Sequence, residues 1–203
     1  MKTLVVKYLP SGANSNTKKL LDLFLEATKG QNIETIDLLN DQMPIFSEAS
    51  IQAYYKRNYG GQKLNTEEAK LLEKNDQLIA QLKSADVLVM AYPMHNFGMP
   101  AAAKSYLDAV IFNGETFEMG KKLMAGKKAL TLFTAGGIYS EDAFGPDYPN
   151  WNTINLLSKI NFGFMGFDEA EVLGTSLRDP ANQAERLAQS KEKIGAIVNK
   201  WYK

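Results

Sequence analysis

Cysteine is absent from this chain of 203 residues, and histidine occurs only once. The lack of cysteine excludes disulfide bonds, thiolate metal sites and a thiol nucleophile. Lys plus Arg and Asp plus Glu each number 23, so the net charge is zero and nothing indicates a nucleic-acid or membrane partner. The chain has no apolar run of about 18 residues that would span a bilayer, and its N-terminus lacks the features of a secretory signal. We therefore expect a cytoplasmic protein.

Short apolar runs alternate with helical patterns along the chain, and the length suits one domain over residues 1–203. The expected strands are Leu4–Val6, Ile33–Leu38, Val87–Ala91, Lys128–Thr134 and Glu171–Gly174. The first expected helix is capped by Asn14 or Ser15 and runs to about Thr28. The other expected helices are 65–84, 100–112, 151–160 and one that begins at Pro180 after an Asp179 cap. Residues 40–64 and 138–150 are expected to be irregular. This alternation predicts an α/β fold with a doubly wound, five-stranded parallel sheet in the order 2-1-3-4-5, with helices on both faces.

The loop after the third expected strand has an unusual composition. Tyr92-Pro93 ends the apolar run, Met94-His95-Asn96-Phe97-Gly98 follows, and Pro100 opens a helical pattern. Ligands of open parallel sheets bind at the carboxyl ends of the strands. An amide, an aromatic ring and a glycine that lets a ligand approach the backbone suit a polar heteroaromatic ring. For His95, a hydrogen bond to a neighbouring carbonyl is the alternative to ligand contact.

The loop after the first strand is rich in hydroxyl and amide groups and runs into a helix. Ser15, Asn16 and Thr17 lie where free N–H groups and the helix dipole favour an anion, and Lys18 and Lys19 add positive charge. The dinucleotide and P-loop glycine signatures are both absent, which favours a mononucleotide phosphate. A plain helix cap with a polar turn is the alternative reading.

Paired glycines, Gly136-Gly137, follow the fourth strand directly after Thr134-Ala135. Their N–H groups can face the oxygens of a flat ring, although a tight turn is the simpler reading. The loops after strands one, three and four lie at one edge of the predicted sheet. Together they fit one flavin mononucleotide, FMN.

At this point the chain resembles a known family, the FMN-dependent NADH azoreductases, a branch of the flavodoxin-like NAD(P)H:quinone oxidoreductases. The resemblance covers the whole chain in order and spacing. The matching segments are Pro93–Phe97, Lys104, Tyr106, Asp108, Gly114–Phe117, Gly126–Ala129, Gly136–Ile138 and Gly163–Phe167.

The resemblance implies a flavodoxin-like fold, bound FMN and a role for several residues. Ser15, Asn16 and Thr17 match the phosphate-binding turn. Residues matching the loops at the flavin ring are Pro93, Met94, His95, Asn96, Phe97, Thr134, Ala135, Gly136, Gly137 and Tyr139. Phe164 and Phe117 match the substrate pocket, which Phe164 reaches across a dimer interface.

The implied activity is reduction of quinones and azo compounds by NADH or NADPH in a ping-pong reaction. We expect no membrane, nucleic-acid or metal partner. The flavin carries the chemistry, so no side chain is expected to be catalytic. The sequence departs from the family at Tyr8, His95, Ala135 and Tyr139, and residues 118–125 are shorter than the usual loop. These departures surround the substrate and bear on substrate preference.

Two other functions fit less well. An acyl-carrier-protein phosphodiesterase would need a metal cluster or an activated nucleophile, which one histidine and no cysteine do not suggest. A flavodoxin-like electron carrier would usually have an acidic surface, whereas this chain is neutral. A homodimer is expected because loop aromatics are in surplus, and exposed aromatic clusters often mark interfaces. These aromatics are Tyr54, Tyr55, Tyr59, Phe144, Tyr148 and Trp151.

Overall fold

One parallel sheet organises the chain. The structure is a computed structural model that describes residues 1–137, 139 and 151–203. In these residues five strands form a sheet in the order β2-β1-β3-β4-β5. The strands are β1 (Lys2–Lys7), β2 (Asn32–Asp37), β3 (Val87–Pro93), β4 (Lys128–Thr134) and β5 (Glu169–Thr175). All four neighbouring pairs are parallel, which confirms the predicted sheet and its strand order.

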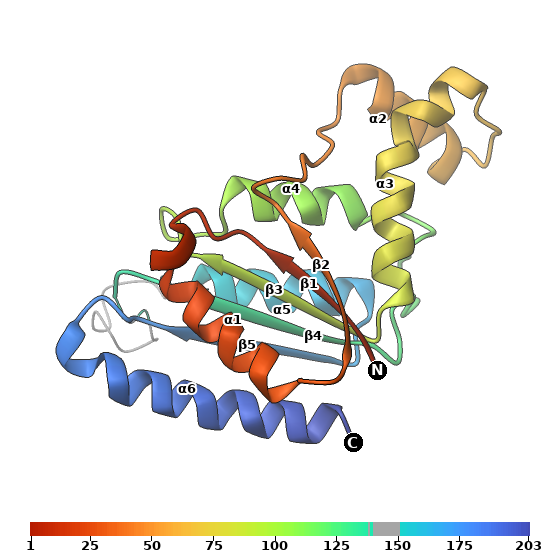
Figure 1. Cartoon of the computed structure of the whole chain (residues 1–203). Coiled ribbons are helices and arrows are strands. Elements are labelled where there is room, and N and C mark those ends of the chain that lie inside the picture. The colour runs from red at the N-terminus through yellow and green to blue at the C-terminus, as the bar shows by residue number, and fades with distance from the viewer. Residues whose placement is uncertain (138, 140–150) are drawn as a thin grey trace.

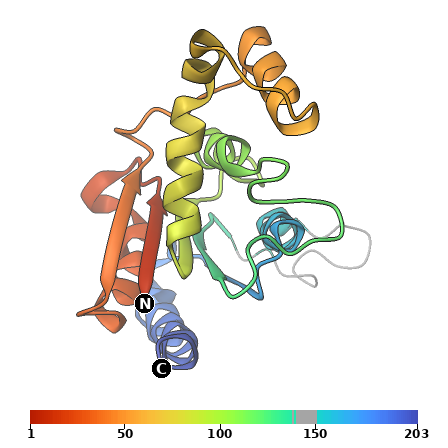
Figure 2. The same cartoon turned by 90° about the vertical axis from the view of Figure 1, so that its right-hand side faces the viewer.

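Helices cover both faces of the sheet, as Figures 1 and 2 show. The helices are α1 (Asn16–Ala27), α2 (Glu48–Tyr54), α3 (Thr66–Ser84), α4 (Ala101–Val110), α5 (Thr153–Met165) and α6 (Pro180–Trp201). α1 and α6 pack side by side on one face, and α3, α4 and α5 lie on the other. Along β1, Leu4 and Val6 join the core under α3, whereas Val5 joins the core under α1 and α6. This alternation explains why the strands are apolar on both faces.

Local signals place the helix ends. Ser15 caps α1 by accepting a hydrogen bond from Lys18 N at 3.2 Å. Asn65 and Glu68 form a reciprocal capping box at the start of α3, and Asp179 caps α6 ahead of Pro180. At the far end of α5, Gly166 adopts φ 85° and closes the helix.

The expectation that residues 40–64 are irregular is wrong. This segment contains α2 and a π-helical turn, η2 (Tyr55–Tyr59), and together with α3 it projects beyond the sheet (Figure 1). Ser47 and Ser50 form the capping box of α2. This pair is a less recognisable helix-start signal in a sequence than a Ser–Glu pair. Tyr54 is buried and accepts a hydrogen bond from Asn113 N at 3.1 Å, so a tertiary contact holds the helix in place. Helix α5 also runs five residues beyond its expected end at Ile160.

Among the described residues, none of the helices combines the length and apolar character needed to cross a membrane.

Candidate functional site

Loops that follow the strands gather at one edge of the sheet, on the left in Figure 1, away from both termini. They enclose a cavity of about 440 Å³, which we call the edge cavity. Its lining residues are Ser11, Asn14, Ser15, Asn16, Thr17, Pro93, Met94, Thr134, Ala135, Gly136, Leu177, Arg178 and Gln183. The three loops singled out in the sequence therefore meet at one cavity.

The start of α1 forms one wall of the edge cavity. Ser15 is buried, and the N–H groups of Asn16 and Thr17 lie in the first helical turn, where no intrahelical acceptor exists. Such donors, together with the helix dipole, favour an anion. The two lysines expected to add charge have other partners. Lys18 Nζ pairs with Asp22, and Lys19 Nζ donates to Asn16 Oδ1 and Gln183 Oε1.

Thr134 connects the three loops. Its Oγ1 lies 2.7 Å from Thr17 Oγ1, and its carbonyl accepts a hydrogen bond from Met94 N at 2.8 Å. Thr17 is fully buried and Thr134 nearly so. These contacts fix the loops after β1 and β3 to the end of β4, which gives the cavity a defined shape.

The loop after β3 is a strained turn. His95 and Gly98 exchange two backbone hydrogen bonds of 3.0 and 2.9 Å, and the two residues between them have positive φ, 47° at Asn96 and 65° at Phe97. Asn tolerates this conformation, but Phe does so at a cost, and such strain concentrates at functional sites. Three contacts hold Phe97: its carbonyl accepts from Thr153 Oγ1, and its ring packs edge-on against Trp151 and Tyr139.

The single histidine lies beside this turn. The His95 side chain is exposed, and its ring meets the ring of Tyr8 edge-on, with centroids 5.9 Å apart. His95, Asn96 and Phe97 belong to this loop but are not among the residues that line the edge cavity.

The loop after β4 leaves open space in front of its backbone. A Cβ atom placed on Gly136 would meet nothing within 4 Å, so a ligand can lie directly against this peptide. The ring of Tyr139 covers Gly137 instead. Gly137 also lines an adjoining cavity of about 390 Å³ with Gly136, Ser176, Arg178, Asp179 and Arg186.

The sequence reading missed the fourth loop of the site, between β5 and α6. Leu177, Arg178 and Gln183 line the edge cavity from this side, and Gln183 Nε2 and Asn16 Nδ2 both donate to the Leu177 carbonyl. The signal was available, because this loop also follows the carboxyl end of a strand in the predicted sheet.

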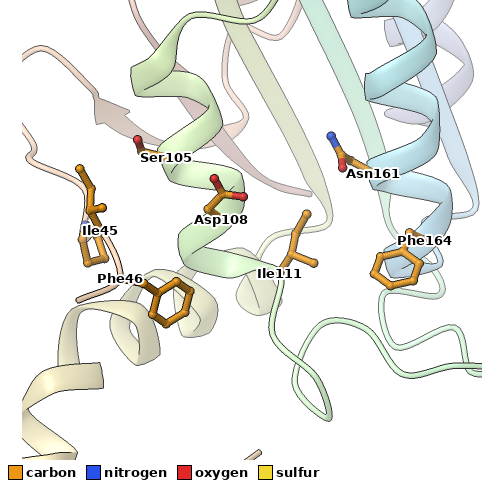
Figure 3. A pocket seen from close by; sticks show the side chains of 8 residues that line it. Ile45, Phe46, Ser105, Asp108, Ile111, Asn161 and Phe164 are labelled. Carbon is orange, nitrogen blue, oxygen red and sulfur yellow. The ribbon is translucent and has the colours of Figure 1, made fainter. Parts of the chain in front are cut away.

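Phe164 and Phe117 lie elsewhere, on the face covered by α4 and α5. Their rings stack with centroids 4.5 Å apart, and neither lines the edge cavity. Phe164 instead borders an outer cavity of about 550 Å³ (Figure 3). Its other lining residues are Pro44, Ile45, Phe46, Ser105, Asp108, Ile111 and Asn161.

The part of the chain that the structure describes contains no group of three His, Asp or Glu side chains placed to hold a metal ion.

Comparison with known proteins agrees with this geometry. The sequence profile of a family described as having a flavodoxin-like fold matches residues 1–198. An FMN-dependent NADH:quinone oxidoreductase of Haemophilus influenzae is 33% identical over 202 residues, covering 96% of each chain. The protein of that name from Shewanella loihica is 33% identical over 205 residues, covering 97% of this chain and 98% of its own. The crystal structure of an FMN-dependent NADH-azoreductase from Bacillus anthracis in complex with FMN superposes with a TM-score of 0.82 at 26% identity, covering 98% of this chain and 100% of the other.

Proposed function

The chain belongs to the flavodoxin-like family of FMN-dependent NADH:quinone oxidoreductases, and we propose that it binds FMN at the edge cavity and uses NADH or NADPH to reduce quinones and azo compounds. The edge cavity carries this proposal, because two of its walls offer different chemistries. One wall has free N–H groups and hydroxyls, and the other has open backbone at Gly136.

These walls fit the two ends of FMN. The phosphate would lie at the start of α1, where the N–H groups of Asn16 and Thr17 and the Ser15 hydroxyl can donate to it. The Ser15 oxygen already accepts from Lys18 N, which leaves its hydrogen free to donate. The flavin ring would lie against Pro93, Met94 and Gly136, with the Asn96 amide and the Phe97 ring at its border.

When bound, FMN would supply the redox chemistry, which is two-electron transfer from NADH or NADPH to the acceptor in the proposed ping-pong reaction. The protein supplies position and electrostatics. The Gly136 N–H, held at the end of β4, can stabilise negative charge that develops on a ring oxygen. No side chain has to act as a nucleophile, which is consistent with a chain that has no cysteine.

A direct experiment is extraction of the cofactor. The purified protein, reconstituted with flavin, should be yellow and should release FMN on denaturation in a one-to-one ratio. A protein that binds no flavin under these conditions would contradict the proposal.

The proposal includes a homodimer. Leu156, Ile160 and Phe164 form an apolar stripe along α5, with exposed fractions of 62%, 53% and 44%. Ile45, beside the outer cavity, is 80% exposed (Figure 3). Exposed apolar surface of this kind usually belongs to an interface. A second copy that covers the outer cavity would bring Phe164 to the neighbouring site, as the resemblance implies.

Of the aromatics that suggested a dimer, Tyr55 and Tyr59 are exposed, Tyr54 is buried and Trp151 is half-buried. Phe144 and Tyr148 lie outside the described residues. A stable interface should bury at least about 1,000 Å². Sedimentation of the flavin-loaded protein should give the mass of a dimer, and Ile160→Glu should shift it to a monomer with lower activity. A monomeric parent protein with full activity would refute the shared site.

The proposed location is the cytoplasm. Reduced nicotinamide cofactors are available there, and disulfide bonds, which a chain without cysteine cannot form, are rare.

A further inference from the structure

Arg178 is the only charged side chain among the described residues that line the edge cavity. It lies in the loop between β5 and α6, and it also lines the adjoining cavity, so its side chain stands where the two cavities meet. The sequence motifs of the phosphate turn and the flavin loops do not include it. It lines the same cavity as Ser15, Asn16 and Thr17 at the start of α1.

The charge of Arg178 is not neutralised by a neighbour in the described part of the chain. No salt bridge or side-chain hydrogen bond involves it there, and it is exposed. The other cations nearby are held by partners. Lys18 is paired with the carboxylate of Asp22, whereas Lys19 and Arg186 keep their charge and are held by neutral groups. Lys19 bonds to Asn16 and Gln183, and Arg186 Nη1 donates to the Ser176 carbonyl at 2.7 Å.

The backbone that carries Arg178 is held firmly toward α1. The Leu177 carbonyl accepts from both Asn16 Nδ2, at 3.4 Å, and Gln183 Nε2, at 2.9 Å. The preceding carbonyl, of Ser176, is held by Arg186. The loop that carries residue 178 is therefore fixed beside Asn16, a residue of the phosphate wall.

We propose that Arg178 binds the phosphate of FMN and makes the site selective for FMN over riboflavin. The inference rests on the proposed function. No cation of α1 lines the cavity, so among the described lining residues Arg178 offers the only full positive charge that a dianionic phosphate could meet directly. The planar guanidinium suits two phosphate oxygens at once, and a lysine can reproduce the charge but not that geometry.

The test is flavin binding, measured from the quenching of flavin fluorescence, with FMN and riboflavin as the two probes. For Arg178→Gln, we expect the Kd for FMN to rise about tenfold, which corresponds to about 1.4 kcal/mol, while the Kd for riboflavin stays the same. The Kd of Arg178→Lys for FMN should lie between that of Arg178→Gln and that of the parent protein. Added salt should weaken FMN binding less in Arg178→Gln than in the parent, because one ion pair is missing.

Lys191→Gln is the matched control, because Lys191 is exposed on α6 away from the cavity and its loss changes the net charge equally. It should bind both flavins as the parent does. Unchanged FMN affinity in Arg178→Gln would overturn the inference, and so would an equal loss of FMN and riboflavin, which would place Arg178 at the ring. If the parent protein binds neither flavin, the proposed function itself fails.

Discussion

Oγ1 of Thr17, at the start of α1, lies 2.7 Å from Oγ1 of Thr134, at the end of β4, although 117 residues separate them in the chain. Both side chains are buried, so the bond is shielded from water. It joins the wall proposed for the phosphate to the loop proposed for the flavin ring. The bond therefore ties two walls of the edge cavity together.

The first prediction concerns this pair. Thr17→Val and Thr134→Val each keep the shape of the side chain but leave the partner hydroxyl buried without its bond. Each should lower the free energy of unfolding by about 1–3 kcal/mol, whereas the double variant should cost less than the sum, because both polar groups are then gone. Urea denaturation of the four proteins measures the coupling. Additive losses would mean that the hydroxyls do not interact.

A second prediction separates the role of the backbone conformation at Asn96, whose φ is 47°, from the role of its side-chain amide. Asn96→Gly should fold as stably as the parent, because glycine adopts this conformation freely. Asn96→Ala should be less stable than Asn96→Gly by about 1 kcal/mol. Both variants lack the amide, so both should bind FMN more weakly if that group contacts the ring. Equal stability of the alanine and glycine variants, measured by urea denaturation, would contradict the strained turn.

Two glycines give a third prediction, with opposite signs. A Cβ on Gly174 would lie 2.1 Å from Cζ of Phe133, whereas a Cβ on Gly195, within α6, would meet nothing within 4 Å. Gly174→Ala should therefore destabilise the protein by about 1–3 kcal/mol through overpacking. Gly195→Ala should stabilise it by about 0.5–1 kcal/mol, since alanine favours a helix. Thermal denaturation ranks the two, and a reversed order would show that the ring does not cover β5 in this way.

The fourth prediction concerns Tyr106, which is fully buried in α4 and whose hydroxyl has no hydrogen-bond partner in the described part of the chain. Tyr106→Phe should leave the stability at neutral pH unchanged or raise it by about 1 kcal/mol, because an unsatisfied polar group is removed.

Alkaline pH extends this prediction. Burial raises the pKa of the Tyr106 phenol above its ordinary value of 10.0, so the folded protein keeps the proton that the unfolded chain releases. Stability is therefore complete below about pH 10 and falls as the pH rises further. Tyr106→Phe should lose less stability over this range than the parent. An identical decline in both proteins would show that this phenol does not contribute.

Much of the fold was predictable because its signals are local. The apolar strands, the Ser15 and Asn65 caps and Pro180 at the start of α6 all act within a few residues. The segment of α2 was not predictable in this way. Its short helix depends on Tyr54, which is held by Asn113 and packs against Phe112 with ring centroids 4.5 Å apart. Such long-range contacts leave no periodic pattern in so short a stretch of sequence.

The site was predictable in outline for a similar reason. Parallel strands bring their following loops to one edge, so the loops at Ser15, Met94 and Gly136 meet as expected. Their detailed partners were not predictable. The pairing of Lys18 with Asp22 offsets a charge that the sequence predicted for the phosphate wall, and Arg178 lines the cavity from a loop with no motif.

The most direct test of the central claim is steady-state oxidation of NADH by the FMN-loaded protein in the presence of a benzoquinone. The absorbance of NADH is followed while both substrates are varied, with free FMN as the blank. The account predicts sustained turnover far above the blank, with parallel double-reciprocal lines for a ping-pong reaction. No oxidation of NADH or NADPH above the blank with any quinone would contradict it and leave a flavin-binding electron carrier in its place.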